Sequence, residues 1–445
     1  MLFNSIAFFG FLVVALAVYW LVPKRAGWQN AMLVMAGAAF YAFWDWRVLA
    51  LFVGSVAVTY LAARSDRKGM SAVAIALLLA VLGVFKYCDF FLSSIGVDAR
   101  LNWILPLGIS FYTFMAVSYL FDVRSGKIMP EKNFTTFAAH MMFFPQIAAG
   151  PIGRADRMLP QYRETRFFDY PLAVEGCRQM LWGYFKKILV ADTCAISVNQ
   201  LLVPEQTSVI GLWVGAILYT VQIYADFSGY SDMAIGSGKL FGIRLVRNFS
   251  YPYFARNIAD FWRRWHISLT SWFRDYVYIP LGGSRCSIGR KFANTMAVFL
   301  LSGLWHGANW TFVAWGALHG LFFVPVLLRG KNAKPLHWAL AYPLTLLAVV
   351  VGWVFFFAPS IVVALSWVKC MFVPLDWNVH GLGLGFCAPA FAFGALMFVA
   401  EWLGRRYEVF TICSSKTIRW LFYISIVVGI FYFYPVTNSF IYFRF

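Results

Sequence analysis

Long apolar runs, separated by short clusters of Lys and Arg, set the pattern along this chain. Several of them approach the roughly 20 apolar residues that an α-helix needs to cross a bilayer. We predict spans at 2–22, 29–44, 48–63, 71–87, 103–121, 188–203, 208–225, 293–310, 311–328, 337–357, 388–404 and 420–434. The pattern therefore predicts an all-α polytopic membrane protein with about 11–12 transmembrane helices.

The basic clusters orient these spans. Lys24 and Arg25 follow the first span, and Arg64, Arg67 and Lys68 follow the third. Two spans separate these clusters, so they lie on one side, which the positive-inside rule assigns to the cytoplasm. Both termini are then expected outside. The first apolar run has no basic n-region or small-residue cleavage site, so we expect it to stay as a helix rather than be removed as a signal.

Four stretches do not fit simple spans. Residues 134–152 are apolar but basic on both flanks, so we predict a re-entrant or interfacial segment. Residues 173–188, which follow a basic stretch and include Lys186 and Lys187, are predicted to form an amphipathic helix on the cytoplasmic surface. Gly229 and two carboxylates within 224–232 argue against an uninterrupted lipid-facing helix there. Residues 243–291 are strongly basic and predict a cytoplasmic segment with structure of its own.

Composition supports this class. The chain is 61% apolar and 13% charged, against about 25% charged residues in soluble proteins. Lys and Arg in cytoplasmic loops account for most of the net charge of +18, so nucleic acid is not implied. The seven cysteines form no CxxC pair, which predicts no disulfide framework and no metal site. We expect a single membrane-embedded domain, with a helical core at about 100–330 and peripheral spans at 1–90 and 337–445.

His306 is the first candidate for chemistry. It lies well inside an apolar run, beside Trp305 and between Gly303 and Gly307. An ionisable side chain at bilayer depth is costly and marks a functional site by default. The glycines indicate a broken or closely packed helix. The alternative is a neutral histidine that is hydrogen-bonded between helices.

The basic segment supplies a second candidate. Taken as one helix, residues 256–276 place large apolar side chains on one stripe, with His266 at its edge. Arg263, Arg264 and Arg274 fall largely on other faces. They indicate a basic vestibule for an anionic ligand, since Arg clusters suit phosphate groups. An interfacial helix with tryptophans at headgroup level explains the same pattern without His266. His319 is read as a helix-packing residue, His140 as part of the re-entrant segment, and His337 and His380 as interfacial or exposed.

Several catalytic motifs are missing from the sequence. It has no GxSxG elbow, Walker loop, GxGxxG fingerprint or HExxH pair. The chain therefore shows no nucleophile of its own. Any chemistry would be base-assisted transfer between two bound substrates.

Two stretches resemble the signatures of the membrane-bound O-acyltransferase family. They are Asp260-Phe-Trp-Arg-Arg-Trp-His-Ile-Ser-Leu-Thr-Ser-Trp-Phe-Arg-Asp-Tyr-Val-Tyr-Ile-Pro-Leu-Gly-Gly283 and Leu304-Trp-His-Gly307. Segments 107–113, 144–151, 224–232 and 440–443 agree with the branch that contains the bacterial alginate O-acetylation membrane protein. The resemblance covers nearly the whole chain. It implies a ring of tilted helices around a tunnel, with the family's two histidines at His266 and His306.

The resemblance also implies a reaction. Acetyl-CoA would be the cytoplasmic donor, with no resident cofactor and no metal. Its phosphates are expected near Arg263, Arg264 and Arg274, and we add Trp305 and Asn309 on the donor side. His306 would act as general base or stabilise the transfer, and His266 would orient the donor. The acceptor would be a serine on a periplasmic SGNH-type, esterase-like partner, which then acetylates a polysaccharide such as alginate outside the bacterial inner membrane.

Other functions stay open at this point. D-alanyl or other acyl transfer to a cell-envelope polymer fits the same family. A transporter, or a scaffold for polysaccharide export without chemistry, fits the broken helices and buried histidines. A transporter would move its substrate intact without consuming acetyl-CoA. The sequence names neither the polymer nor the oligomeric state.

Overall fold

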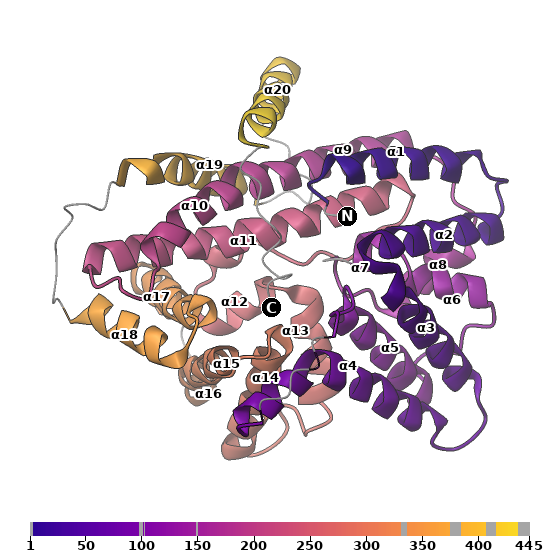
Figure 1. The fold of residues 1–445 in the computed structure, drawn as a ribbon, viewed down its shortest axis with the longest axis horizontal. Helices are drawn as coiled ribbons and strands as arrows, with labels where there is room; N and C mark the ends of the chain where they lie inside the picture. Colours follow the sequence, from indigo (N-terminus) through magenta and orange to yellow (C-terminus); the bar gives the residue numbers. More distant parts are fainter. Residues whose placement is uncertain are drawn as a thin grey trace. The chain divides into compact units, whose positions relative to one another are not determined.

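The computed structural model describes residues 3–97, 101, 103–147, 150–330, 336–373, 384–405 and 415–434. Every regular element in these residues is a helix, as predicted (Figure 1). Three predictions concern residues outside these ranges: the 440–443 motif, the outward C-terminus and the surface position of His380.

The described residues group into two compact units. Unit 1 contains Met1–Met180 and Met233–Val246, and unit 2 contains Leu181–Asp232 and Arg247–Phe445. Two helices contribute to both units: α9 (Tyr170–Tyr184) and α11 (Val209–Leu240). Every site discussed below lies within a single unit.

Unit 1 holds the N-terminal helices together with parts of α9 and α11. Its helices are α1 (Ile6–Leu21), α2 (Ala26–Asp45), the 3-10 turn η1 (Trp46–Val48), α3 (Leu49–Arg64), α4 (Met70–Ser94), α5 (Ile109–Arg124), α6 (Phe134–Met141), α7 (Phe144–Ile147) and α8 (Ala155–Arg163).

Unit 2 holds both predicted histidines. Besides its part of α11 it contains the π-helical segment η2 (Phe185–Ala191), α10 (Asp192–Leu201), η3 (Pro252–Phe254), α12 (Ile258–Arg264), α13 (Ile267–Phe273), the π-helical segment η4 (Arg274–Tyr278), α14 (Ile288–His306), α15 (Trp310–Phe322), α16 (Val324–Arg329), α17 (Trp338–Phe357), α18 (Ile361–Phe372), η5 (Leu384–Cys387), α19 (Ala388–Gly404) and α20 (Lys416–Phe433).

Seven stretches in the described part of the chain are long and apolar enough to cross a membrane. They are Ala26–Arg64, Met70–Ser94, Val209–Leu240, Trp310–Arg329, Trp338–Phe357, Gly385–Gly404 and Lys416–Phe433. Helices α1 and α18 are apolar but shorter. The chain is therefore a multi-pass membrane protein, as its hydropathy pattern predicts.

A buried arginine ties the first two helices of unit 1 to the segment after α8. The guanidinium of Arg166 donates to the hydroxyl of Tyr19 at 2.6 Å and to the amide oxygen of Asn30 at 2.7 Å. Its backbone N–H donates to Gln29 at 2.9 Å. The sequence predicts Arg166 in a basic cytoplasmic stretch, but its side chain is buried. The guanidinium of Arg166 therefore stabilises the core of unit 1 and does not lie at a membrane surface.

The apolar stretch 134–152 is broken, as predicted. Helix α6 ends at Met141, and the four-residue α7 follows after a short break. Neither helix is long enough to cross a bilayer, which takes about 20 residues. Residues 148 and 149 lie outside the described ranges.

Helix α11 runs without a break through 224–232, but it is not lipid-facing there, since Asp226 and its neighbours are buried in protein. The prediction of a surface helix at 173–188 is wrong. Residues 170–201 are also helical almost throughout, but Lys186 and Lys187 are buried rather than on a cytoplasmic surface. The carboxylate of Asp226 can lie within an unbroken helix because the ammonium group of Lys187 faces it.

Helices α14 and α15 form the closely packed pair that the glycines of the His306 motif predict (Figure 1). A Cβ on Gly303 would lie 2.2 Å from the carbonyl oxygen of Phe312, and one on Gly316 would lie 2.3 Å from that of Phe299. Small residues let helix backbones approach this closely in membrane proteins. The close packing of α14 against α15 holds the C-terminal end of α14, where His306 lies, in place.

Candidate functional site

His306 is the last residue of α14 and is buried, at 3% exposure. Three aromatic rings surround its imidazole: the ring centroids lie 5.0 Å away for Trp305, 5.1 Å for Trp315 and 5.3 Å for Phe356. Trp315 belongs to α15 and Phe356 to α17, so three helices build this environment. The sequence predicts a span over 293–310 with His306 well inside it, whereas the helix ends at His306 itself.

The chain turns sharply after His306. Gly307 is extended, which ends α14. The side-chain oxygen of Asn309 accepts a hydrogen bond from the backbone N–H of Thr311 at 3.0 Å and so caps α15. Asn side chains are strong N-caps because they satisfy a free N–H of the first turn. This capping accounts for Asn309, whose contact with a donor stays a prediction.

His266 lies at a break, and the prediction of one helix over 256–276 is wrong. Helix α12 ends at Arg264 and α13 begins at Ile267, with His266 between them in the left-handed region (φ 44°, ψ 54°). Such a conformation is uncommon for a residue with a Cβ and persists only when surrounding structure holds it. The break, not a helical stripe, aims the imidazole into unit 2.

Hydrogen bonds from Asn248 hold this junction. The side-chain oxygen of Asn248 accepts from the backbone N–H of Ser268 at 3.2 Å and from its hydroxyl at 2.7 Å. The backbone carbonyl of Asn248 accepts from the N–H of Ile267 at 2.8 Å. These contacts identify the atom facing His266 as the amide oxygen of Asn248, an acceptor.

That assignment fixes the tautomer of His266. Its Nδ1 lies 3.3 Å from Oδ1 of Asn248, so Nδ1 carries the hydrogen and donates it. The lone pair is then on Nε2, a buried atom with no hydrogen-bond partner among the described residues. Buried polar atoms rarely lack partners, and an exception calls for an explanation such as a bound substrate or water.

Burial also sets the charge of His266, which lies outside the seven membrane-crossing stretches. Desolvation lowers the pKa of His266 to about 3. The imidazole is therefore neutral near pH 7, with a lone pair able to accept a hydrogen bond.

Trp305 brings the two predicted histidines together. Its ring centroid lies 5.9 Å from that of His266 and 5.0 Å from that of His306. The ring of Phe227, from α11, also contacts His266, with the centroids 4.6 Å apart. Trp305, predicted on the donor side, thus contacts both imidazoles.

His319 joins the same group of rings. It is fully buried on α15, with Trp315 at 4.9 Å and Trp262 at 5.0 Å between ring centroids. Neither of its ring nitrogens has a hydrogen-bond partner among the described residues. Its contacts agree with a packing role. We call His266, Trp305, His306, Trp315 and His319 the histidine cluster.

The three predicted donor-binding arginines are held in local ion pairs. Arg263 and Arg264 both contact Asp260, at 3.2 Å and 3.1 Å, and their side chains are 74% and 35% exposed. Arg274 contacts Asp275 at 2.7 Å and is 62% exposed. All three keep a face toward solvent, and Arg264 is the most shielded. Their binding of phosphates stays a prediction.

A second buried polar group in unit 2 was not predicted from the sequence. The ammonium group of Lys187, 1% exposed, lies 2.8 Å from carboxylate oxygens of both Asp192 and Asp226, which are buried as well. Lys186 pairs with Asp232 and donates to the hydroxyl of Ser228 at 2.9 Å. We call Lys186, Lys187, Asp192, Asp226 and Asp232 the lysine network.

A buried tyrosine connects the lysine network to α19. The ring of Tyr224 lies 5.9 Å from the ammonium of Lys186, and its hydroxyl donates to the carboxylate of Glu401 at 2.8 and 2.9 Å. The signal in the sequence was two adjacent lysines inside the apolar stretch 180–203. Ionisable residues at such positions face protein interiors and pair with one another. Only the fold shows which carboxylates they meet.

The described residues contain no group of three or more His, Cys, Asp or Glu side chains that could hold a metal ion. The arrangement suits proton transfer instead. Two imidazoles among aromatic rings can serve a hydroxyl or thiol that enters the site, one as a proton acceptor and the other as a hydrogen-bond acceptor. Apolar ring surfaces disfavour water in such a space.

The chain is similar to known acyltransferases over most of its length. It is 38% identical to the probable alginate O-acetylase AlgI of Azotobacter vinelandii over 86% of this chain and 80% of that protein. It is 35% identical to the peptidoglycan O-acetyltransferase of Helicobacter pylori over 83% of this chain and 80% of that protein. The teichoic acid D-alanyltransferase of Streptococcus thermophilus is 30% identical over 52% of this chain and 58% of its own length.

Residues 128–368 match the membrane-bound O-acyltransferase family, and this stretch includes His266, His306 and His319. The family match and the long similarities to O-acetyltransferases agree with the signatures in the sequence. The chain belongs to the membrane-bound O-acyltransferase family and is an O-acyltransferase.

Proposed function

We propose that this protein takes acetyl groups from acetyl-CoA in the cytoplasm and passes them across the inner membrane for O-acetylation of an extracytoplasmic polysaccharide. The observation that carries the proposal is that the rings of His266 and His306 both contact Trp305, inside one aromatic cluster. Such a site can bring a thioester and a hydroxyl to one base.

The chemistry balances without a covalent enzyme intermediate. His306 accepts the proton of the acceptor hydroxyl as its oxygen attacks the thioester carbonyl. The C–S bond breaks, the thiolate leaves, and the proton moves to it to form free coenzyme A. General-base assistance of this kind contributes about 10²–10⁴-fold to a rate. His266, neutral and held in one tautomer, orients the donor beside the reacting carbonyl.

The aromatic walls have a role in this scheme. Trp305, Trp315 and Phe356 leave little polar surface around His306. Water is the competing acceptor for a thioester, so a site that excludes it protects the acetyl group from hydrolysis.

Donor and acceptor approach from opposite sides in this proposal. Acetyl-CoA is anionic, and residues 243–291, which carry Arg263, Arg264 and Arg274, supply positive charge on the proposed cytoplasmic side. The acceptor is a hydroxyl from outside. We propose that it is a serine of a periplasmic esterase-like partner, because this chain has no hydrolase-type nucleophile motif of its own.

The relatives favour acetyl over D-alanyl transfer. The alginate and peptidoglycan O-acetyltransferases align with most of the chain, whereas the D-alanyltransferases align with about half of it. Two alginate O-acetylases are 38% identical to this chain and the peptidoglycan O-acetyltransferase is 35% identical, so we propose a polysaccharide acceptor such as alginate.

The direct test uses the purified protein in proteoliposomes with acetyl-CoA labelled in the acetyl group. An acetyltransferase releases coenzyme A in proportion to ester formed on an added hydroxyl acceptor, and D-alanyl donors give no product. Transport of a labelled compound without any coenzyme A release would contradict the proposal and support the transporter interpretation.

The orientation has its own test. Single cysteines at Ser287 and Asn438, placed in a variant without native cysteines, are labelled in intact cells with a membrane-impermeant maleimide. We expect labelling at Asn438 and not at Ser287. The reverse pattern would place the basic segment outside, and the cytoplasmic donor side would be wrong.

A further inference from the structure

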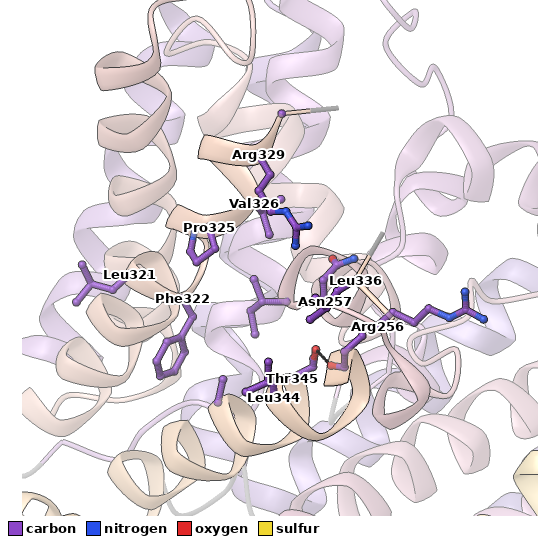
Figure 2. A pocket seen from close by; sticks show the side chains of 14 residues that line it. Arg256, Asn257, Leu321, Phe322, Pro325, Val326, Arg329, Leu336, Leu344 and Thr345 are labelled. Carbon is purple, nitrogen blue, oxygen red and sulfur yellow. Dashed lines mark hydrogen bonds between the residues drawn. The ribbon is translucent and has the colours of Figure 1, made fainter. Parts of the chain in front are cut away.

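A groove of about 450 Å³ lies in unit 2 between the α15–α16 segment, α17 and the start of α12 (Figure 2). This volume falls within the range of about 300–1,000 Å³ that is typical of small-molecule sites. The groove is open on one side. It contains no residue of the histidine cluster or of the lysine network.

The walls of the groove are hydrocarbon. The side chains that form them come from α15, α16 and α17: Leu321, Phe322, Pro325, Val326, Leu344 and Ala348. Among the described lining residues the one side-chain hydroxyl, on Thr345, already donates to the backbone carbonyl of Ala341 at 2.7 Å. The interior therefore suits an alkyl chain and offers almost nothing to a polar one.

One edge of the groove is basic. Arg329 ends α16, and Arg256 and Asn257 precede α12 (Figure 2). The side-chain oxygen of Asn257 caps α12 through the N–H of Asp260 at 2.8 Å, which leaves its NH₂ group for a ligand. Nε of Arg256 donates to the hydroxyl of Tyr342 at 3.2 Å, and its guanidinium extends outward from the rim, whereas that of Arg329 points toward the groove (Figure 2).

We propose that the groove binds an anionic phospholipid. The headgroup phosphate would lie at the edge made by Arg256, Asn257 and Arg329, and one acyl chain would lie along the hydrocarbon walls. Arginine recognises phosphate through paired N–H donors. A charged rim beside an apolar interior can bind both the headgroup and the acyl chain of a lipid.

The position in the fold agrees with a lipid. Both Trp310–Arg329 and Trp338–Phe357 are long and apolar enough to cross the membrane, and the basic edge lies at the end of one and near the start of the other. Positive charge at this end indicates the cytoplasmic leaflet. That leaflet carries the anionic lipids that attract Lys and Arg beside membrane spans.

The thioester donor fits this groove less well. Its pantetheine arm carries two amides that need hydrogen-bond partners, and an amide buried without one costs free energy. The hydrocarbon walls supply none, and Thr345 is already engaged. The donor is therefore the alternative that the experiment must exclude.

A bound lipid would brace the elements that build the histidine cluster. Helix α12 carries Trp262, α15 carries His319 and α17 carries Trp353. The ring of His319 lies 5.0 Å from Trp262 and 6.4 Å from Trp353. Because the groove is lined by these same three elements, an acyl chain in it would restrict how they move against one another.

The test is native mass spectrometry of the purified full chain with 1-palmitoyl-2-oleoyl-phosphatidylglycerol or the corresponding phosphatidylcholine. We expect one phosphatidylglycerol to be retained more tightly than any phosphatidylcholine. Arg256→Gln with Arg329→Gln should weaken it about tenfold or more, since charge-assisted contacts are lost. Ala348→Phe should weaken binding by filling the chain site while both arginines stay.

Controls separate this site from general membrane adhesion. Arg285→Gln with Arg419→Gln removes two cationic side chains away from the groove and should leave the tight phosphatidylglycerol in place. Equal retention by wild type and both groove variants would overturn the proposal. Displacement of the lipid by acetyl-CoA or by inorganic phosphate would also overturn it, since the edge would then bind the donor or a free anion. Melting temperatures in detergent confirm that each variant is folded.

Discussion

The histidine cluster and the lysine network are both buried polar groups of unit 2, and they differ in how their polar atoms are satisfied. In the lysine network each ammonium group faces oxygen partners, with Asp192 and Asp226 on Lys187 and Asp232 and Ser228 on Lys186. In the histidine cluster, Nε2 of His266 has no partner among the described residues.

This difference indicates a role in folding for the lysine network and a role in the reaction for the histidine cluster. A satisfied buried ion pair is costly to break, so it holds helices in register. A buried polar atom without a partner costs free energy and is retained where something else must bind. We therefore expect substitutions in the lysine network to act on folding and substitutions at the proposed catalytic histidines, His266 and His306, to act on the reaction.

The largest effect is expected for His306→Ala. Removal of the proposed base should lower acetyl transfer by about 10²–10⁴-fold, the usual contribution of general-base catalysis. The variant should still accumulate in the membrane, because its neighbours are rings that can close around a small side chain. The measurement is polymer acetylation in cells lacking the native gene, with membrane levels determined by blot.

Two companion variants define the role of His306. His306→Gln keeps some hydrogen bonding but takes up no proton near neutral pH, so it should be nearly as inactive. His319→Ala should be milder, because that residue packs among rings. Normal acetylation by His306→Gln would refute the general base, and loss of His306→Ala from the membrane would indicate a structural role instead.

Lys187→Met should have the opposite signature. It leaves Asp192 and Asp226 buried without their ammonium partner, and breaking a buried pair in this way costs about 3–5 kcal/mol. We expect little folded protein, measured as a lower melting temperature in detergent and a weaker band in membranes. Any folded fraction should keep its activity per molecule.

Lys239→Met is the matched control for Lys187→Met. Lys239 contacts Glu175 at 2.6 Å, but that carboxylate is 30% exposed, so water can replace the lost partner. Its loss of stability should be much smaller. Adding Asp192→Asn and Asp226→Asn to Lys187→Met should restore part of the folded protein. A Lys187→Met variant that is stable but inactive would show that the lysine network takes part in the reaction rather than in folding.

The two regions also differ in how far the sequence predicts them. The close helix packing beside His306 follows from local signals: an apolar run with Gly303 and Gly307 in it, which predict a broken or closely packed helix. The burial of Lys187 depends on Asp226, which is 39 positions away in the chain, so no local pattern shows it. Adjacent lysines beside a basic stretch are typical of a helix on a membrane surface, and for this reason residues 173–188 were predicted to form one.

The region of His266 was predicted for partly wrong reasons. Helical spacing places Trp262, Trp265 and Leu269 on one stripe, and all three are buried. The helix nevertheless breaks at His266, because Asn248 binds the backbone and side chains of the junction. A contact between residues 18 positions apart outweighs local helix propensity, and the sequence pattern does not contain it.

Asn248→Asp tests whether His266 acts as a neutral, oriented imidazole. In the wild type, burial lowers the pKa of His266 to about 3, so the ring stays neutral throughout pH 5–8. A carboxylate beside Nδ1 favours the protonated ring and raises that pKa. The protonated fraction grows as the pH falls, and it has no lone pair on Nε2. Activity should therefore fall on the acid side, by roughly tenfold at pH 6.

The pH profile distinguishes this effect from misfolding. Asn248→Ala should lower activity by a similar factor at every pH, because it removes the orienting acceptor without adding charge. The profiles are measured with acetyl-CoA at saturation over pH 5.5–8.5. Parallel profiles for wild type and Asn248→Asp would show that His266 does not take part through Nε2.

The smallest effects are expected at the arginines, and their order is informative. A charge-assisted contact is weak where water screens it. Arg263 and Arg274 are more than half exposed, whereas Arg264 is 35% exposed. Arg264→Gln should therefore raise the KM for acetyl-CoA a few-fold, and Arg263→Gln and Arg274→Gln by less than twofold, each with little change in kcat. Equal, negligible effects at all three would show that they only hold the basic segment at the membrane surface, as positive-inside residues do. A fall in kcat instead would place them beside the histidine cluster rather than on the path of the donor.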